Sequence, residues 1–138
     1  MPARDFYHDI LKSALIKEGW KITDDPFVME YKGLRLYADL AAERIIAAEK
    51  SGEKIVVEIK VFGGLSLVSE LERAVGQYGI YRTILKQINP ERILFLAIAL
   101  DIYQDFFQQP AIQEIIADHQ IRLIVFEPET EEIVQWIS

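Results

Sequence analysis

Residues 55–62, with the sequence IVVEIKVF, constrain this 138-residue chain more than any other segment. They form a run of strand-forming residues that only Glu58 and Lys60 interrupt. Residues two apart on a strand point to the same face, so this carboxylate and this ammonium lie side by side, while Val57 and Ile59 face a core. Charged groups in an apolar strand are costly unless they are paired or bind a metal. The segment therefore predicts either an ion pair or a metal site.

Length and composition predict one globular domain over residues 1–138, of which 51% are hydrophobic and 27% charged. The longest apolar run, residues 93–100, is much shorter than the roughly 20 residues that a membrane span needs. The absence of cysteine excludes disulfides, a thiol nucleophile and zinc–thiolate clusters. No secretory signal is visible at the start of the sequence. We expect a soluble cytoplasmic protein with no membrane partner.

The charge is unevenly distributed along the chain, whose formal net charge is −7. Residues 1–82 hold 12 Lys/Arg and 13 Asp/Glu, whereas residues 83–138 hold 3 Lys/Arg and 9 Asp/Glu. Such acidity argues against a protein that coats DNA nonspecifically. Any contact with DNA would have to use the nearly neutral first part, a bound metal or a basic partner.

The pattern of apolar residues, glycines and prolines predicts an α/β or α+β domain with a central mixed sheet flanked by helices. Ser66 or Ser69 is expected to cap the long helix, and Ser69 with Glu72 fits a capping box. Hairpin turns are expected at Lys32-Gly33 and at Ser51-Gly52. The predicted helices are 5–19, 67–88, 101–107 and 111–119, and the predicted strands are 27–31, 34–40, 43–50, 53–62, 92–99, 122–126 and 132–137.

Two further features bear on the charged strand. Asp39 lies nineteen residues before Glu58, in a strand that hairpin geometry can bring beside it. Two converging carboxylates repel each other unless a cation lies between them, and such oxygen ligands suit Mg²⁺ or Mn²⁺. Gln77 and Tyr81 are four residues apart and share one helix face. The alternatives are a partly buried salt bridge of Glu58 and a helix face that only packs on the core.

These residues together resemble a known enzyme superfamily. Asp39, the triplet Glu58-Ile59-Lys60 and the pair Gln77 and Tyr81 look like the PD-(D/E)XK nucleases, the last pair being similar to the RecB-like branch. Ala38 replaces the proline of the superfamily's name, a position that carries no ligand. The resemblance implies a restriction-endonuclease-like fold.

Nearly the whole chain resembles a narrower family, XisH. The segments that carry this resemblance are PARDFYHDILKSALIKEGWKITDDP, LYADLAAERIIAAEK, ERAVGQYGIYR and FEPETEEIVQWI. Members of the family are cyanobacterial controlling factors for excision of the fdxN DNA element, and they act beside a recombinase and a small partner, XisI. DNA, an XisI-like protein and a site-specific recombinase are thus the partners that the resemblance implies, and a homodimer is a further expectation for this fold class.

The superfamily's roles transfer to matching positions only. Asp39, Glu58 and the main-chain carbonyl of Ile59 would hold Mg²⁺ or Mn²⁺, and Lys60 would position or activate the attacking water. Gln77 and Tyr81 would orient the metal-bound groups or contact a phosphate. On the first helix His8 or Asp9 could add a further group, and the alternative for His8 is a residue on the helix surface.

Three functions remain open at this point. The first is a metal-dependent endodeoxyribonuclease that serves programmed DNA excision. The second is a non-cleaving regulatory subunit on the same scaffold, which binds the XisI-like protein or the recombinase. The third is a structural domain in which the charged residues form an ion pair without a metal.

Overall fold

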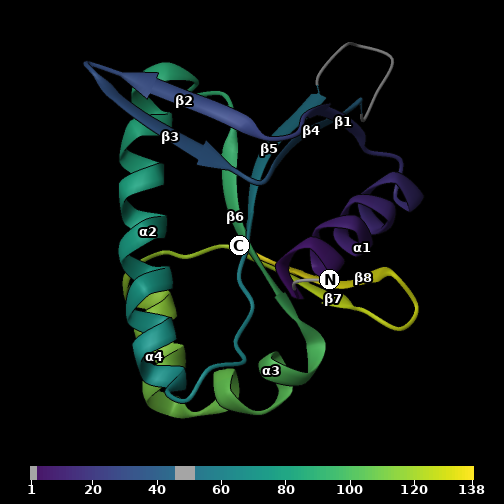
Figure 1. Cartoon of the computed structure of the whole chain (residues 1–138), viewed down its shortest axis with the longest axis vertical. Helices are drawn as coiled ribbons and strands as arrows, with labels where there is room; N and C mark the ends of the chain where they lie inside the picture. Colours follow the sequence, from purple (N-terminus) through teal and green to yellow (C-terminus); the bar gives the residue numbers. More distant parts are fainter. Residues whose placement is uncertain (1–2, 46–51) are drawn as a thin grey trace.

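The chain folds around a six-stranded mixed sheet (Figure 1). The structure is a computed structural model, and it describes residues 3–45 and 52–138. Its helices are α1 (Ala3–Lys17), α2 (Leu67–Ile88), α3 (Leu100–Gln104), the 3-10 helix η1 (Phe106–Gln108) and α4 (Pro110–Asp118). Its strands are β1 (Lys21–Asp24), β2 (Phe27–Tyr31), β3 (Leu34–Ala38), β4 (Leu40–Ile45), β5 (Gly52–Ile59), β6 (Ile93–Ala99), β7 (Leu123–Glu127) and β8 (Glu132–Ile137).

The strand order in the large sheet is β1-β4-β5-β6-β7-β8. The central strands β5, β6 and β7 are parallel, and the pairs toward both edges are antiparallel. The long helix α2 is the crossover between β5 and β6, as parallel neighbours require. This arrangement confirms the expected single α/β domain with a central mixed sheet.

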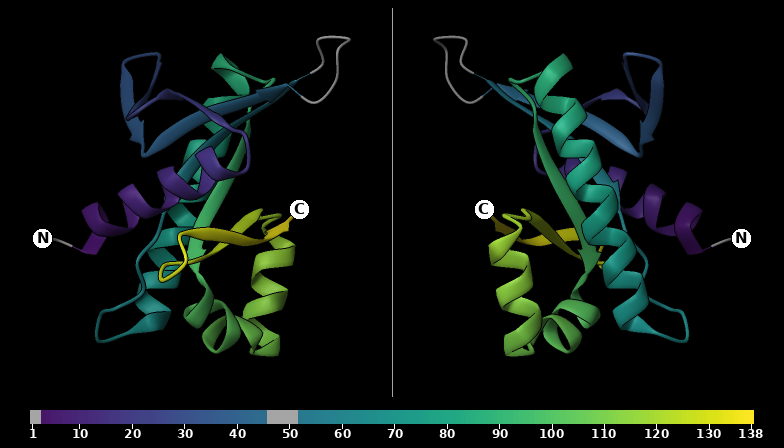
Figure 2. Two further views of the ribbon diagram at one scale, coloured as in Figure 1. Left: turned by 90° about the vertical axis from the view of Figure 1, so that its right-hand side faces the viewer. Right: turned by 90° about the vertical axis from the view of Figure 1, so that its left-hand side faces the viewer.

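Helices cover both faces of the sheet, with α1 on one side and α2 and α4 on the other (Figures 1 and 2). Alternation along the central strands supplies both cores: Val56 and Leu96 pack on the α2 side, whereas Val57 and Phe95 pack on the α1 side. Strands that are buried on both faces read as continuous apolar runs, which explains the sequence of β6.

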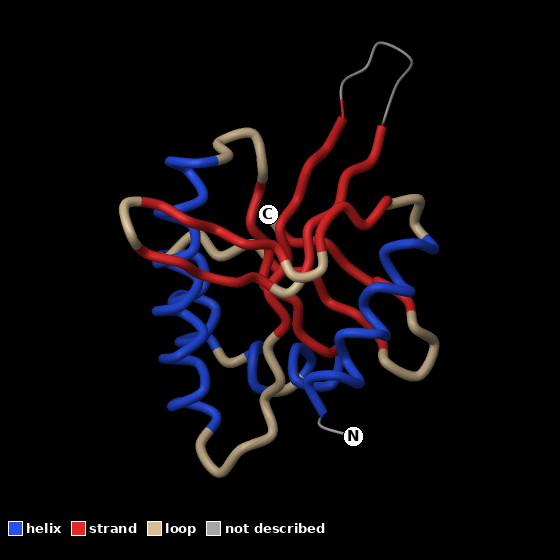
Figure 3. Tube along the Cα trace, turned by 45° about the horizontal axis from the view of Figure 1, so that its top comes forward, coloured by secondary structure: helices blue, strands red, loops and turns tan. Residues whose placement is uncertain are grey.

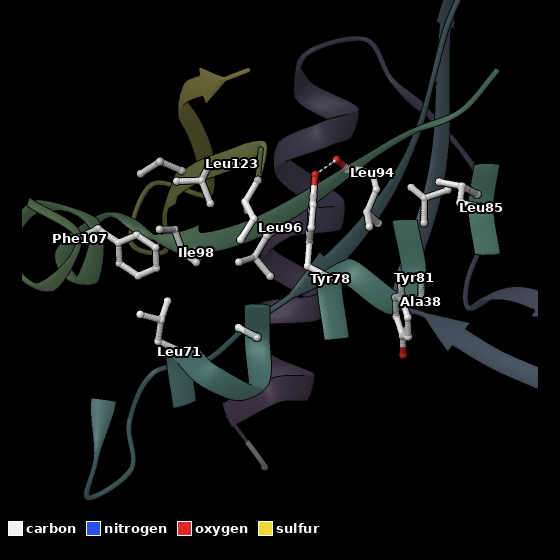
Figure 4. Packing of buried hydrophobic residues seen from close by; sticks show 14 of the residues in the cluster. Ala38, Leu71, Tyr78, Tyr81, Leu85, Leu94, Leu96, Ile98, Phe107 and Leu123 are labelled. Carbon is white, nitrogen blue, oxygen red and sulfur yellow. Dashed lines mark hydrogen bonds between the residues drawn. The ribbon is translucent and has the colours of Figure 1, made fainter. Parts of the chain in front are cut away.

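The core beneath α2 contains one notable polar anchor (Figure 4). The hydroxyl of buried Tyr78 donates to the carbonyl of Leu94 at 2.9 Å and accepts the backbone N–H of Arg122 at 3.1 Å. Aliphatic side chains such as Leu71 and Ile98 fill the rest of this layer. The bonds of Tyr78 fix α2 to β6 and to the start of β7.

Strands β2 and β3 form a separate two-stranded hairpin that reaches toward α2 (Figures 1 and 3). The predicted strand 34–40 is therefore too long, because β3 ends at Ala38, the chain bends at Asp39 and β4 starts at Leu40 in the other sheet. The prediction of a strand over 43–50 is wrong in its start for the same reason. Residues 46–51, which include Ser51 of the expected turn, lie outside the described residues.

Other boundaries also differ from the predictions. Strand β5 ends at Ile59 rather than at residue 62. Helix α2 has the predicted bounds, and its N-cap is Ser66, one of the two predicted capping residues, whose side chain accepts the N–H of Ser69. The predicted capping box of Ser69 and Glu72 is wrong. The predicted helix 101–107 is α3 followed by η1. Within the described part of the chain, no helix combines the length and apolar character that crossing a membrane requires.

Candidate functional site

Two carboxylates meet where the chain passes from the hairpin into the large sheet. Leu40 pairs with Val57 in the antiparallel β4–β5 ladder, which sets Asp39 opposite the end of β5 and next to Glu58. Both residues are 5% exposed, in a molecule whose other buried residues are almost all apolar. Acidic residues are rarely buried unless they are paired. The burial of two neighbouring acids thus marks this place as more than a packing site.

Each carboxylate accepts a backbone N–H from the segment that contains the other. Glu58 Oε1 accepts the N–H of Asp39 at 3.2 Å, and Asp39 Oδ2 accepts the N–H of Ile59 at 2.7 Å. These bonds fix the two acids relative to each other. The N–H and C=O of one strand residue point to the same side, so the Ile59 carbonyl also faces the edge where Asp39 lies. Three oxygen donors of the predicted metal set thereby lie at one edge of β5.

Helix α2 adds two polar side chains to this cluster. The Gln77 amide nitrogen lies 3.2 Å from Glu58 Oε2 and 3.0 Å from the hydroxyl oxygen of Tyr81, and it donates to both. Tyr81 in turn donates to the backbone carbonyl of Tyr37 in β3 at 2.8 Å. The expected pair on one face of α2 is thus joined to Glu58 and to the hairpin.

Helix α1 contributes His8, and the turn after β1 contributes Asp25. His8 Nδ1 lies 4.0 Å from Asp39 Oδ1, and His8 Nε2 lies 2.8 Å from Asp25 Oδ1. Of the two first-helix candidates, His8 is therefore the one beside the acids, whereas Asp9 is exposed. Asp25 was missed at the sequence level because the sequence Asp-Asp-Pro reads only as a turn.

Asp25 is held ionised by its neighbours. Burial raises the pKa of its carboxyl, but the hydrogen bonds and charges of Lys12 and His8 outweigh burial and hold this pKa below its ordinary value. The hydrogen bond to Asp25, 2.8 Å long, and the charge of that carboxylate raise the pKa of Lys12. A short chain of ionisable side chains thus runs from Lys12 through Asp25 and His8 to Asp39.

Of the predicted site residues, Lys60 has the fewest contacts with the others. Its backbone N–H donates to the carbonyl of Ala97, and its side chain is half-buried. Within residues 3–45 and 52–138, this ammonium forms no hydrogen bond or ion pair. Because β5 ends at Ile59, strand alternation no longer fixes its direction relative to Glu58.

The donor set suits a hard divalent cation. No group of three or more His, Cys, Asp or Glu side chains converges among the described residues. Magnesium does not need such a group, because it keeps several waters and binds through one or two carboxylates. Two carboxylates and a main-chain carbonyl therefore fit magnesium or manganese by chemistry, and they do not resemble a histidine-rich zinc site.

The comparisons with known proteins agree with one another. The family model described as "XisH protein" matches residues 1–134. The chain belongs to the XisH family. A crystal structure of an XisH family protein from Nostoc punctiforme shares 41% identity and a TM-score of 0.89, covering 97% of this chain and all of that one.

A second XisH relative carries a more specific name. The crystal structure of a fdxN element excision controlling factor protein from Anabaena variabilis has 42% identity and a TM-score of 0.89, over 98% of this chain and 100% of that chain. A search of curated proteins found no match. The XisH resemblance that the sequence indicated is thus confirmed over nearly the whole chain.

Proposed function

We propose that this XisH protein is an excision controlling factor for a DNA element and that it hydrolyses DNA phosphodiesters with Mg²⁺ or Mn²⁺. The observation that carries the proposal is the buried meeting of Asp39 and Glu58, to which Gln77 and Tyr81 are joined by hydrogen bonds. The role in excision is supported by the name of the Anabaena variabilis relative.

Each residue has a stated task in this proposal. Asp39, Glu58 and the Ile59 carbonyl hold the cation, which when bound polarises the scissile phosphate. Lys60 donates hydrogen bonds to the attacking water and offsets negative charge that develops on the phosphate oxygens. The water oxygen forms a new bond to phosphorus and loses a proton to solvent. The bond from phosphorus to the leaving sugar oxygen breaks, and that oxygen takes up a proton from solvent to become a hydroxyl.

Gln77 and Tyr81 act as positioning residues. The hydrogen bond from Gln77 holds the second oxygen of Glu58, and the hydroxyl of Tyr81 holds Gln77 in turn. His8, on α1, lies 4.0 Å from Asp39 and is a polar neighbour of that carboxylate on the other side of the sheet. Such supporting contacts set the geometry of metal-binding carboxylates.

A cleavage assay tests the catalytic proposal. Purified protein is incubated with supercoiled, single-stranded and branched DNA in the presence of Mg²⁺ or Mn²⁺. We expect Glu58→Ala to lower the cleavage rate by about 100-fold or more, because it removes one of the carboxylates that would hold the divalent cation. The control is Glu53→Ala on the same strand, since Glu53 pairs with Arg44 away from the acids. Absence of cutting on every substrate, or equal rates for the two variants, contradicts the proposal.

Metal binding is tested separately from cleavage. Calorimetric titration with Mn²⁺ should give binding that Asp39→Asn weakens and that Glu53→Ala leaves unchanged. If the parent protein binds no Mn²⁺, the two acids serve a purely structural purpose and the metal-dependent reaction is excluded.

A non-cleaving regulator on the same scaffold is the second candidate function. It is favoured by the acidity of residues 83–138 and by the backbone N–H hydrogen bonds that the carboxylates of Asp39 and Glu58 already accept. An acidic surface suits a basic protein partner, and an XisI-like protein and the recombinase are the proposed partners. Co-purification of either one with a protein that cuts no DNA would favour this function. Efficient cutting by the isolated protein, with no complex formed, would exclude it.

A further inference from the structure

A pocket with a volume of about 760 Å³ lies on another face of α2 from Gln77 and Tyr81. Its walls come from α2, α4, the start of β7 and the end of the chain. The volume lies within the range of sites that hold small molecules. Nothing in the proposed nuclease reaction uses this pocket, so its role is a separate question.

Three cations line the pocket, and no Asp or Glu side chain does. They are Arg82, Lys86 and Arg122. Residues 83–138 hold only 3 Lys/Arg against 9 Asp/Glu, and two of those three cations are here. Between any of them and a carboxylate, the described part of the chain contains no ion pair. Cations that pair with no described Asp or Glu side chain, in an otherwise acidic region, favour an anionic ligand.

Arg82 is held in place before any ligand arrives. Its Nη1 donates to the carbonyls of His119 at 2.7 Å and Gln120 at 3.5 Å, and its guanidinium lies 5.7 Å from the ring centre of Tyr78. Both hydrogen bonds use one nitrogen, and they tie α2 to the end of α4. A guanidinium fixed in this way loses little further freedom on binding a phosphate or carboxylate.

The remaining wall suits a heterocyclic ring. Tyr103 is half-buried and offers an aromatic side chain, on which bases stack. Gln113 and Gln120 carry amides that each provide donors and an acceptor, which is the pattern that the edges of nucleobases present. Gln120 also has a φ of +53°, a backbone conformation that residues other than glycine seldom adopt.

We propose that this pocket binds a mononucleotide, with its phosphate between Arg82, Lys86 and Arg122 and its base near Tyr103 and Gln120. Cations alone would suit any small anion. The aromatic and amide groups beside them add the chemistry of a base, and the volume accommodates both parts. The proposal does not depend on whether the protein cuts DNA.

Calorimetric titration with AMP, GMP, CMP and UMP tests the proposal, with inorganic phosphate and ribose 5-phosphate as partial ligands. At least one nucleotide should bind more tightly than either partial ligand. Lys86→Gln should weaken this binding by about tenfold, the loss expected for one charge-assisted hydrogen bond. The control is Arg73→Gln, which removes a charge from an exposed position of α2 that does not line the pocket.

A second variant separates binding from folding. Gln120→Gly removes the amide and relieves the positive φ, so the variant should remain at least as stable as the parent while its nucleotide affinity falls. The proposal is overturned if no nucleotide binds, or if inorganic phosphate binds as tightly as every nucleotide. Unchanged affinity in both Lys86→Gln and Gln120→Gly would also overturn it, because binding would then occur elsewhere.

Discussion

Two tyrosines on α2 show how the surroundings of a residue decide its role. Tyr78 and Tyr81 are both buried, and each hydroxyl both donates to a backbone carbonyl and accepts an N–H. The bonds of Tyr78 lie within the core, whereas Tyr81 connects Gln77 with the hairpin strand β3. Side chains of the same type, three residues apart, are therefore expected to differ in function and to be similar in their contribution to stability.

This pair gives a matched test. Tyr78→Phe and Tyr81→Phe should each lower the free energy of unfolding by about 1–3 kcal/mol, because each leaves buried polar groups without partners. Only Tyr81→Phe should also lower the cleavage rate, since Gln77 then loses the contact that orients it toward Glu58. Urea unfolding and the cleavage assay measure the two effects. Equal loss of activity in both variants would mean that Tyr81 acts through stability alone.

Asp25 gives a prediction for pH. A carboxyl whose pKa is lower in the folded than in the unfolded chain stabilises the fold at pH values above its ordinary pKa of 3.8. This stabilisation is lost as the pH falls through the pKa of the folded state. Asp25→Asn should therefore cost about 1 kcal/mol near neutral pH, the upper range for a partly exposed ion pair, and much less in strong acid. Urea unfolding over that pH range is the measurement. Asp118→Asn, at an exposed position, serves as the control; a cost for Asp25→Asn that does not change with pH would contradict the assignment.

At the scale of elements, α2 contains two glycines that neither close packing nor backbone conformation requires. A Cβ added at Gly76 or Gly79 would meet nothing within 4 Å, and neither has a positive φ. Glycine inside a helix is less favourable than alanine by roughly 0.5–1 kcal/mol. By contrast, Gly33 has a φ of +88° in the turn between β2 and β3.

Alanine substitutions at the helix glycines and at Gly33 should change the free energy of unfolding in opposite directions. Gly76→Ala and Gly79→Ala should each raise the free energy of unfolding by roughly 0.5–1 kcal/mol. Gly33→Ala should lower it by about 1 kcal/mol, because an added Cβ has space at Gly33 but alanine is strained at a positive φ. Thermal and urea unfolding of the three variants check this. Destabilisation by either helix substitution would show that α2 requires the glycine for a reason other than space.

The elements that the sequence predicted best are those set by local chemistry. Helix α2 has the predicted bounds because a serine cap, a long apolar pattern and Asn89-Pro90 all act on neighbouring residues. The assignment of β2 and β3 to a second sheet depends on pairing between distant segments, and no local pattern encodes it. The same holds within the site. The spacing of Gln77 and Tyr81 was readable, whereas the approach of Asp25 to His8 depends on how α1 packs.

At the scale of the whole molecule, one sheet carries two cores. Alternate residues of β5 and β6 belong to the hydrophobic clusters on opposite faces of the sheet, so both helical layers pack on the same strands. The candidate site lies where these layers meet, with His8 from α1, Gln77 from α2 and the acids between them. Its geometry therefore requires both layers to be folded at once, which favours a single cooperative unit.

Unfolding should accordingly be one transition by two independent probes. Both tryptophans of the chain, Trp20 and Trp136, stack at 5.5 Å in the α1-side layer and report on it by fluorescence. The longest helix, α2, lies in the other layer and contributes strongly to far-ultraviolet circular dichroism. In urea the two midpoints should coincide, as two-state unfolding requires.

Variants in each layer make the test stricter. Leu11→Ala in α1 and Leu71→Ala in α2 each delete a buried side chain and should cost about 2–5 kcal/mol. Each should shift both midpoints together, because the damage is transmitted through strands that the layers share. If Leu71→Ala lowers the midpoint by circular dichroism and leaves the fluorescence midpoint unchanged, the α2 layer unfolds by itself. A site assembled from both layers could then open without global unfolding, and its carboxylates would be exposed far more often than their burial implies.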